Sequence, residues 1–193
     1  KETEQLAAEK IKAELQLLKA QIHPHFLFNT LNNIYFFSLK GSPKAPEMIK
    51  KLSSLLHYIM NECNQPMVPL QKEIKMVRDY MALEEMRYGE QMKMTIEIQN
   101  EFADKMIAPL LLIPFVENSF KHGLNNHLSK GFVTIKLNVE EKQIQFDIEN
   151  SKAESLPATE HRRSGGIGLV NVRRRLNLLY PDHYQLEIRD NPN

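Results

Sequence analysis

Apolar residues in the first third of the chain recur at alternating steps of four and three, which is the spacing of a helix with one buried stripe. The members of this row are Ile11, Leu15, Leu18, Ile22, His25, Asn29, Asn32, Phe36 and Leu39. Residues 41–46 then carry Gly and Pro, and a second row beyond them predicts a return helix. This second row consists of Met48, Leu52, Leu55 and Ile59. Because a two-helix hairpin cannot cover two apolar stripes by itself, we expect two copies to pair into a four-helix bundle.

From residue 69 onward, helical and strand-like patterns alternate. Residues 69–88 and 108–122 have helical spacing, and residues 92–98 alternate as a half-buried strand does. Residues 133–139 and 144–148 predict an antiparallel hairpin. The remaining segments are a polar loop at 152–164, a glycine turn at 165–168 that opens a helix ending at 179, and a last strand at 184–188. This order predicts an α+β fold built as a layered sandwich.

Composition and charge are those of an ordinary soluble globular chain. Of the 193 residues, 42% are hydrophobic and 25% are charged, enough for one large domain or two small ones. The net charge of +1 gives no electrostatic reason to expect nucleic acid as a direct partner. The single cysteine, Cys63, excludes a disulfide within the chain and fits a reducing compartment. The chain starts in mid-pattern without a methionine, so we expect a piece of a longer protein.

Three segments together resemble one known protein family. They read QIHPHFLFNTLN at residues 21–32, PLLLIPFVENSFKHG at 109–123 and GGIGLVNVRRRL at 165–176. In this order they resemble the phosphoacceptor, N-box and glycine-box motifs of LytS-type sensor histidine kinases. Residues 69–89 are similar to that family's linker helix.

The resemblance implies a fold of two parts and a signalling reaction. A dimerising helical hairpin, residues 1–66, would precede an ATP-binding α/β sandwich of the histidine-kinase, gyrase and Hsp90 kind, residues 67–193, whose final strand would lie beyond this chain. The implied activity is ATP-dependent autophosphorylation in a homodimer, followed by transfer to an aspartate of a response regulator, with the LytTR type as a candidate. The implied location is the cytoplasmic part of an inner-membrane protein, which reaches the membrane only through a missing N-terminal part.

By its motif position, His25 rather than His23 is the implied phosphoacceptor. A neutral imidazole has an available lone pair near pH 7, since its ordinary pKa is about 6.5, and it can attack a phosphoryl group. Pro24 precedes it in a helical pattern and has no N–H to donate, which predicts a kink beside the histidine. Many other histidine kinases have an acid directly after the histidine, whereas this chain has Phe26. The group that orients the imidazole proton must therefore come from elsewhere, either from Asn29 one turn on or from the ATP-binding part.

The resemblance assigns the magnesium and triphosphate contacts to the segment VENSFKH. It makes Asn118 a Mg²⁺ ligand through its amide oxygen and places Lys121 and His122 near the triphosphate of ATP. Glu117 would help to orient magnesium or water. A hard cation takes oxygen ligands and keeps several waters, so one amide plus phosphates is chemically sufficient.

The glycine box implies further nucleotide contacts at Gly166, Gly168 and Leu169. Glycine lets backbone amides approach a phosphate closely at the start of a helix, where a β-carbon would block the approach. The polar loop before it, residues 152–164, is then the ATP lid. The same interpretation predicts phosphate contacts at Arg162 and Arg163 and a solvated helix face at Arg173, Arg174 and Arg175.

One position departs from the family pattern. Related kinases have a D-x-G-x-G segment whose aspartate accepts a hydrogen bond from the adenine amino group. The corresponding stretch here is FDIENSKAE, which aligns Asn150 with that aspartate and lacks both glycines. The asparagine oxygen can still accept the bond, but a neutral acceptor is weaker by about 1 kcal/mol, so we expect weaker nucleotide binding.

Two alternative functions remain open at this point. The first is a degenerate scaffold that dimerises without turning over ATP, through contacts at Leu15, Leu18, Leu52 and Leu55. The second is a gyrase-like or chaperone-like ATPase, which would release phosphate steadily without labelling itself. The second alternative leaves the His25 motif unexplained.

Overall fold

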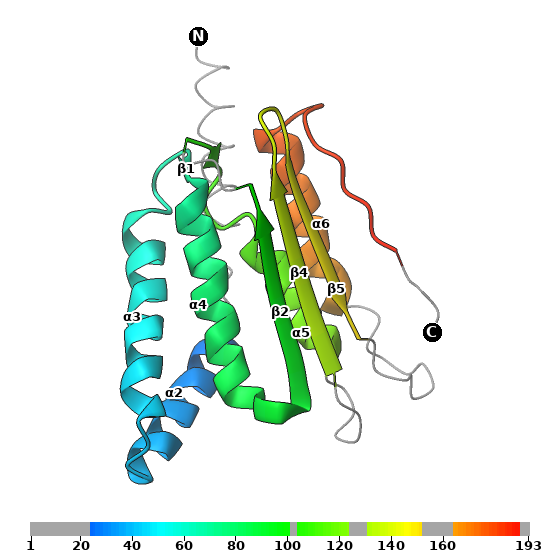
Figure 1. Ribbon diagram of the computed structural model, residues 1–193. Helices are drawn as coiled ribbons and strands as arrows, with labels where there is room; N and C mark the ends of the chain where they lie inside the picture. Colours follow the sequence, from blue (N-terminus) through cyan, green and yellow to red (C-terminus); the bar gives the residue numbers. More distant parts are fainter. Residues whose placement is uncertain (1–23, 101–103, 124–130, 152–163, 190–193) are drawn as a thin grey trace.

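The computed structural model describes residues 24–100, 104–123, 131–151 and 164–189 (Figure 1). The helices in this part of the chain are α2 (Pro24–Leu39), α3 (Lys44–Asn61), α4 (Leu70–Tyr88), α5 (Ile113–Gly123) and α6 (Ser164–Leu179), with a short 3-10 helix at Gly89–Gln91. One sheet consists of β2 (Met92–Gln99), β4 (Gly131–Val139) and β5 (Ile144–Asn150), and a second pairs β1 (Val68–Pro69) with β3 (Met106–Ile107). The predicted α+β class is confirmed. None of the described helices has the length and hydropathy needed to cross a bilayer.

The helices α2 and α3 form the predicted hairpin, joined at Gly41. This glycine has a φ of +60°, a conformation that side chains with a β-carbon rarely adopt. Its N–H donates to the Ser38 carbonyl at 3.0 Å, and the N–H of Ser42 donates to Phe37 at 2.9 Å. These bonds satisfy carbonyls at the end of α2 and reverse the chain.

The two hairpin helices differ in how well the sequence row predicts the buried stripe. On α3, the predicted residues Met48, Leu52 and Leu55 are buried. On α2, the buried residues are Phe26 and Thr30, with Ile34 and Phe37 partly buried beside them, so the inner stripe is not the predicted one. The predicted row His25, Asn29, Asn32, Phe36 and Leu39 lies instead on exposed or half-buried positions.

The three-stranded sheet has one buried face and one polar face. Strands β2 and β4 are parallel, and β4 pairs antiparallel with β5 as predicted. Alternate residues of β4 are almost completely buried: Val133, Ile135, Leu137 and Val139. Helix α4 packs against β2, while α5 packs against β4 and β5. Among the described residues, these helices cover one face of the sheet, and the side chains of the other face are mostly polar and largely exposed, as expected for half-buried antiparallel and mixed sheets.

Hairpin and sheet share one continuous hydrophobic core. Buried residues of α3 such as Leu52 belong to the same cluster as Val77 of α4, Val116 of α5 and Leu176 of α6. Figure 1 shows α3 and α4 side by side along most of their length, and these two helices are in direct contact. The described hairpin is therefore packed onto the rest of the chain.

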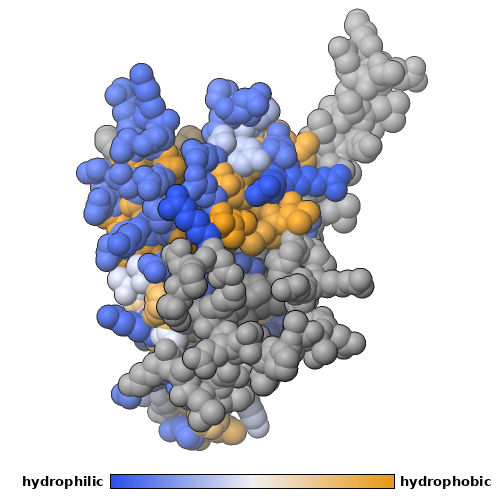
Figure 2. Space-filling view, turned by 90° about the vertical axis from the view of Figure 1, so that its right-hand side faces the viewer, coloured by the Kyte–Doolittle hydropathy of each residue, from blue (hydrophilic) through white to orange (hydrophobic). Residues whose placement is uncertain are grey.

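The predicted last strand is wrong: residues 184–188 have no strand partner in the described structure. Tyr184 and Leu186 pack against the core while Gln185 and Glu187 are exposed, so one-sided packing alone produces the alternation. On this side of the molecule, shown in Figure 2, apolar residues gather between hydrophilic ones. Ile188 is 61% exposed there.

The predicted glycine turn is also wrong in its local form. Residues 165–168 lie within the first turns of α6 instead of preceding it. At the other predicted helix start, α5 begins at Ile113 rather than at residue 108. Leu110 has a φ of +57° in the turn before it, which interrupts the helix although the side chains there are apolar.

Candidate functional site

His25 lies in the first turn of the described part of α2, and its side chain is exposed. The Nδ2 atom of Asn29 is 3.2 Å from His25 Nδ1 and 3.3 Å from His25 Nε2. An amide nitrogen only donates, whereas the amide oxygen can accept a ring N–H, so turning the amide over lets Asn29 hold either tautomer. The predicted partner Asn29 is within reach. The predicted kink before Pro24 depends on residues outside the described part.

A second histidine on the hairpin has the same kind of partner. His57 on α3 is exposed, and its Nδ1 is 3.1 Å from the Nδ2 of Asn61, four residues on. A histidine and an asparagine at this spacing therefore do not mark a phosphoacceptor by themselves. What distinguishes His25 is its surroundings.

The residue after His25 anchors the start of α2 in the core. Phe26 is 5% exposed and stacks on Tyr80 of α4, with ring centroids 4.3 Å apart and an interplanar angle of 21°. Tyr80 in turn lies 5.9 Å from the ring of Phe120 on α5, and Phe120 stacks with Tyr88 at 6.3 Å. This aromatic row connects the helix of His25 to the helix of Asn118. Phe26 thus packs at the junction between these two helices.

Ionisable side chains lie close to Tyr80 at this junction. Burial raises the pKa of Tyr80 well above its ordinary value, so its hydroxyl remains protonated. Burial also raises the pKa of the Glu84 carboxyl, and Arg87, whose Nη1 lies 3.3 Å from Glu84 Oε2, opposes that shift.

Asn118 is half-buried on α5, two residues before Phe120. Its neighbours Glu117 and Ser119 are buried, and the Ser119 hydroxyl donates to the Val116 carbonyl at 2.7 Å. The backbone of residues 121 and 122 continues α5, but their side chains lie outside the described part. The predicted roles of Lys121 and His122 therefore stay predictions.

Asn150 is the last residue of β5 and is partly buried. Its Nδ2 donates to the Ser151 carbonyl at 2.8 Å, which leaves the amide oxygen as the atom suited to accept a bond. Ser151 also ties this end of β5 to β4: its N–H donates to the Phe132 carbonyl at 3.0 Å, and its hydroxyl accepts the Phe132 N–H at 3.0 Å.

The predicted nucleotide residues lie on three elements that meet. Helix α5 packs against both α6 and β5. The end of α5, the end of β5 and the start of α6 lie towards the lower end of the three-stranded sheet in Figure 1. Gly166 and Gly168 are in the first turns of α6, and Leu169 is half-buried there. Arg162 and Arg163 lie outside the described residues.

Arg175 and Glu73 are among the buried charged residues whose burial the sequence did not predict. Arg175, predicted to be on a solvated face, is 4% exposed, while Arg173 and Arg174 are exposed as predicted. Glu73 on α4 is completely buried. Helical spacing could have found both, because Arg175 is three residues after buried Val172, and Glu73 is three after buried Leu70.

Comparisons with known proteins agree with the motif pattern. Residues 13–92 match the family model described as Histidine kinase. The chain is 30% identical over 201 aligned positions to Sensor protein LytS of Oceanobacillus iheyensis, which covers 96% of this chain and 34% of that protein. It is 33% identical over 184 positions to Sensor histidine kinase YpdA of Escherichia coli strain K12, covering 92% of this chain and 32% of that protein.

A third relative is Sensor histidine kinase BtsS of the same strain, 30% identical over 181 positions, with 94% of this chain and 32% of the relative covered. The chain thus spans about a third of the length of these curated relatives.

Proposed function

Because the chain belongs to the family of LytS-type sensor histidine kinases, we propose that it phosphorylates His25 with magnesium ATP and passes the phosphoryl group to an aspartate of a response regulator. The response regulator, of which the LytTR type is a candidate, and anchorage of the longer protein in the inner membrane are parts of the same proposal.

The observation that carries the proposal is the aromatic row from Phe26 through Tyr80 to Phe120. It connects an exposed histidine to the helix of Asn118 through ring contacts of 4.3 and 5.9 Å. Phosphoryl transfer depends chiefly on positioning, since the reacting groups must approach within about 3–3.5 Å. A packed junction between the acceptor helix and the N-box helix supplies such positioning.

In the proposed reaction, Asn29 orients the His25 ring. Its amide oxygen accepts the N–H at Nδ1, which leaves the lone pair on Nε2. Nε2 attacks the γ-phosphorus of ATP, a P–N bond forms, and the bond from phosphorus to the bridging oxygen of ADP breaks. The exposed position of His25 leaves this ring accessible to the substrate.

We assign the nucleotide to the space between α5, β5 and the start of α6. The amide oxygen of Asn118 would ligate Mg²⁺, with Lys121 and His122 near the triphosphate and the backbone of Gly166, Gly168 and Leu169 at the phosphates. An oxygen donor on a half-buried helix fits a hard cation that keeps water and phosphate ligands. The magnesium would neutralise the charge that develops on the phosphates.

Asn150 is the proposed adenine contact. Its nitrogen is engaged with Ser151, so its oxygen is oriented away from that bond and can accept the adenine amino group. A neutral acceptor supports weaker binding than the usual aspartate would.

The proposed homodimer uses a different surface from the one predicted. Leu52 and Leu55 are already buried within the single chain, at 6% and 3% exposure, so they are not dimer contacts; Leu15 and Leu18 lie outside the described residues. The exposed apolar side chains of the hairpin instead repeat at helical steps on one side of each helix. They include Phe28, Leu31, Tyr35 and Leu39 on α2 and Ile49, Leu56 and Met60 on α3, and Phe36 on α2 is exposed beside this row. A second copy would cover these stripes.

The scaffold alternative rests on Asn150 in place of the usual aspartate. A scaffold that can no longer bind the nucleotide would show no magnesium-dependent binding of an unhydrolysable ATP analogue in calorimetry. A kinase with a weakened adenine contact would still bind the analogue, with severalfold lower affinity than relatives that keep the aspartate.

The test of the proposal is labelling with γ-³²P ATP and Mg²⁺. The wild type and a His57→Gln variant should acquire acid-labile label at the same rate, whereas His25→Gln should acquire none. His57 is the matched control because it lies on the same hairpin and also has an asparagine, Asn61, four residues on. Equal labelling of His25→Gln and wild type would eliminate the assignment.

A further inference from the structure

Glu73 on α4 joins several parts of the chain from a fully buried position. Its Oε1 accepts the Tyr58 hydroxyl at 2.5 Å and the Leu110 N–H at 2.6 Å. Its Oε2 accepts the N–H groups of Leu111 at 3.1 Å and Leu112 at 3.3 Å. Four donors surround the two oxygens, an arrangement that fits the ionised carboxylate.

The three backbone donors belong to the turn that leads into α5. Residues 110–112 directly precede Ile113, where α5 begins. N–H groups at a helix start have no carbonyl partner within the helix, and a negative charge there is favoured by the helix dipole. Glu73 therefore caps α5, the helix of Asn118, from a neighbouring helix. The cap also holds Leu110 at its positive φ of +57°.

Arg175 on α6 holds the carbonyl groups of the same turn. Its Nη1 donates to the Leu110 carbonyl at 2.7 Å, and its Nη2 donates to the Pro109 carbonyl. Burial has the largest effect on the Glu73 carboxyl and raises its pKa above the ordinary value, while the hydrogen bonds from Tyr58 and the turn and the charge of Arg175 oppose that rise. The two buried charges thus compensate each other across the turn, and they fix α4, α5 and α6 to it.

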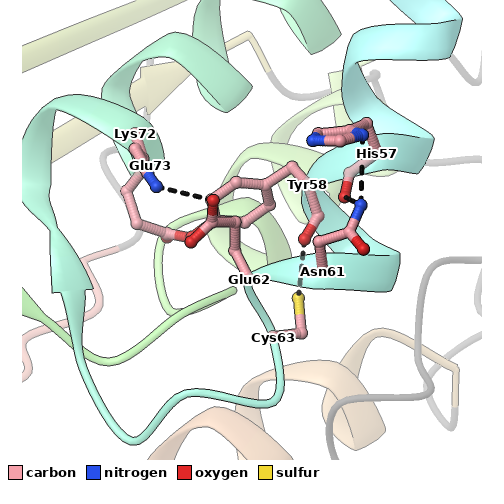
Figure 3. Close-up of polar contacts among 7 residues, drawn as sticks. All are labelled: His57, Tyr58, Asn61, Glu62, Cys63, Lys72 and Glu73. Carbon is pink, nitrogen blue, oxygen red and sulfur yellow. Dashed lines mark hydrogen bonds and ion pairs between the residues drawn. The ribbon is translucent and has the colours of Figure 1, made fainter.

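Tyr58 connects this cluster to the hairpin. It lies on α3, is 7% exposed, and points its hydroxyl at Glu73 (Figure 3). Other contacts of charged side chains between the hairpin and α4 lie nearer the surface, such as Lys51 with Asp79 at 3.7 Å and Lys72 with Glu62 at 2.5 Å. Exposed pairs of this kind contribute about 0–1 kcal/mol each. A buried bond to a charged acceptor is the stronger polar link from hairpin to sheet.

We propose that Glu73 is the positioning residue for phosphoryl transfer: it fixes the helices of Asn118 and of the glycine segment to each other, and through Tyr58 it fixes both to the hairpin of His25. This inference rests on the proposed function. It assigns separate effects to Tyr58 and Glu73. Tyr58 sets where the histidine lies relative to the nucleotide, and Glu73 sets both that position and the nucleotide site itself.

The first test compares Tyr58→Phe with Tyr180→Phe. Tyr180 is the matched control because its hydroxyl accepts the Ala108 N–H at 2.8 Å, next to the same turn, but it lies beyond α6 and not on the hairpin. Tyr58→Phe should lower the labelling rate at saturating ATP by about tenfold or more, because a shift of about 1 Å in a reacting group has effects of that size. The affinity for an unhydrolysable ATP analogue should stay within about twofold, and Tyr180→Phe should change neither quantity by more than that.

The second variant, Glu73→Gln, separates positioning from general stability. An amide has one acceptor oxygen, so it cannot receive all four donors. We expect both the analogue affinity and the labelling rate to fall, in contrast to Tyr58→Phe. If Tyr58→Phe keeps the wild-type labelling rate at a temperature well below its unfolding, Tyr58 is only a structural residue and the inference is overturned.

A distance measurement tests the positioning claim without ATP. Cysteines at exposed Ser53 and Gln145, in a Cys63→Ser background, would carry spin labels on α3 and β5. Labelled protein diluted with unlabelled protein should give one narrow distance distribution for wild type and Tyr180→Phe, and a broader or shifted one for Tyr58→Phe. An unchanged distribution in Tyr58→Phe would contradict the inference. A wild type that shows the expected distances but acquires no label would refute the proposed function instead.

Discussion

The hairpin and the three-stranded sheet differ in how much apolar surface they leave exposed. The sheet turns its apolar residues inward and exposes polar ones, such as Lys136 and Gln145, on its outer face. The hairpin buries one stripe against α4 but leaves Tyr35 and Leu39 exposed at 67% and 70%. The outer face of the described sheet is therefore mostly polar, whereas the described hairpin has an exposed apolar stripe. This difference favours an assembly in which the hairpin, and not the sheet, forms the contact between copies.

The largest effect should come from breaking the junction between the two regions. Phe26→Ala removes a buried ring that stacks on Tyr80, and such changes cost about 3–5 kcal/mol in the free energy of unfolding. The control is Phe132→Ala on the outer face of the sheet, where the side chain is 37% exposed and the cost should be about 1 kcal/mol or less. Chemical denaturation measures both. Equal losses would show that Phe26 has no special place in the core.

A pair of leucines on α3 distinguishes the inner stripe from the outer one. Leu52→Ala should cost about 2–5 kcal/mol of folding stability, because the side chain is 6% exposed within one chain. Leu56→Ala, at 38% exposure, should cost much less when the protein is diluted to the monomer. Denaturation over a range of protein concentrations measures this contrast. A larger loss for Leu56 at high dilution would contradict the assignment of the two stripes.

The exposed stripe of α2 can be tested directly. Leu31→Glu combined with Tyr35→Glu removes two apolar side chains from the proposed dimer surface, each contributing about 1.5–3 kcal/mol when fully buried. The dimer dissociation constant should rise by about 100-fold or more, at 1.4 kcal/mol for each factor of ten. Analytical ultracentrifugation measures the constant, with Thr134→Glu on the sheet as the control. Dissociation by the control alone would place the interface on the sheet.

The smallest effect is expected on the polar face of the sheet. Lys136 lies 4.0 Å from Glu97 on the neighbouring strand, and both side chains are largely exposed. Lys136→Ala should change the free energy of unfolding by about 0–1 kcal/mol and leave the dimer unaffected. Thermal unfolding at low and high salt is the measurement. A loss of several kcal/mol would mean that this face is covered after all.

The sequence predicted those elements whose pattern arises from local burial. The inner stripe of α3 and the alternation of β4 follow directly from the periods of helix and strand. The alternation of apolar and polar residues from Tyr184 to Ile188 led to a wrong strand prediction. A segment that packs one side against a core shows this alternation even without a strand partner. On α2 the predicted row is exposed or half-buried, and it shares only Leu39 with the exposed apolar stripe that we propose as the dimer surface.

The candidate site was predictable only where a motif marked it. The roles of His25, Asn118 and Asn150 were predicted from their segments and stay predictions, while the structure places these residues on elements that pack together. Glu73 and Arg175 were not predicted as buried partners, because their bonds go to backbone groups of a turn more than 30 residues away along the chain. Side-chain identity gives no signal for bonds to a backbone whose conformation is unknown.

The central claim is that His25 accepts the phosphoryl group from a nucleotide bound near Asn118. Its most direct test is to incubate the protein with magnesium ATP, digest it under alkaline conditions that preserve phosphohistidine, and locate the phosphate by mass spectrometry. The account predicts phosphate on the peptide that contains His25, and its loss in an Asn118→Ala variant. Phosphate on His57 or His23 instead, or labelling of His25 that survives the loss of Asn118, would contradict it.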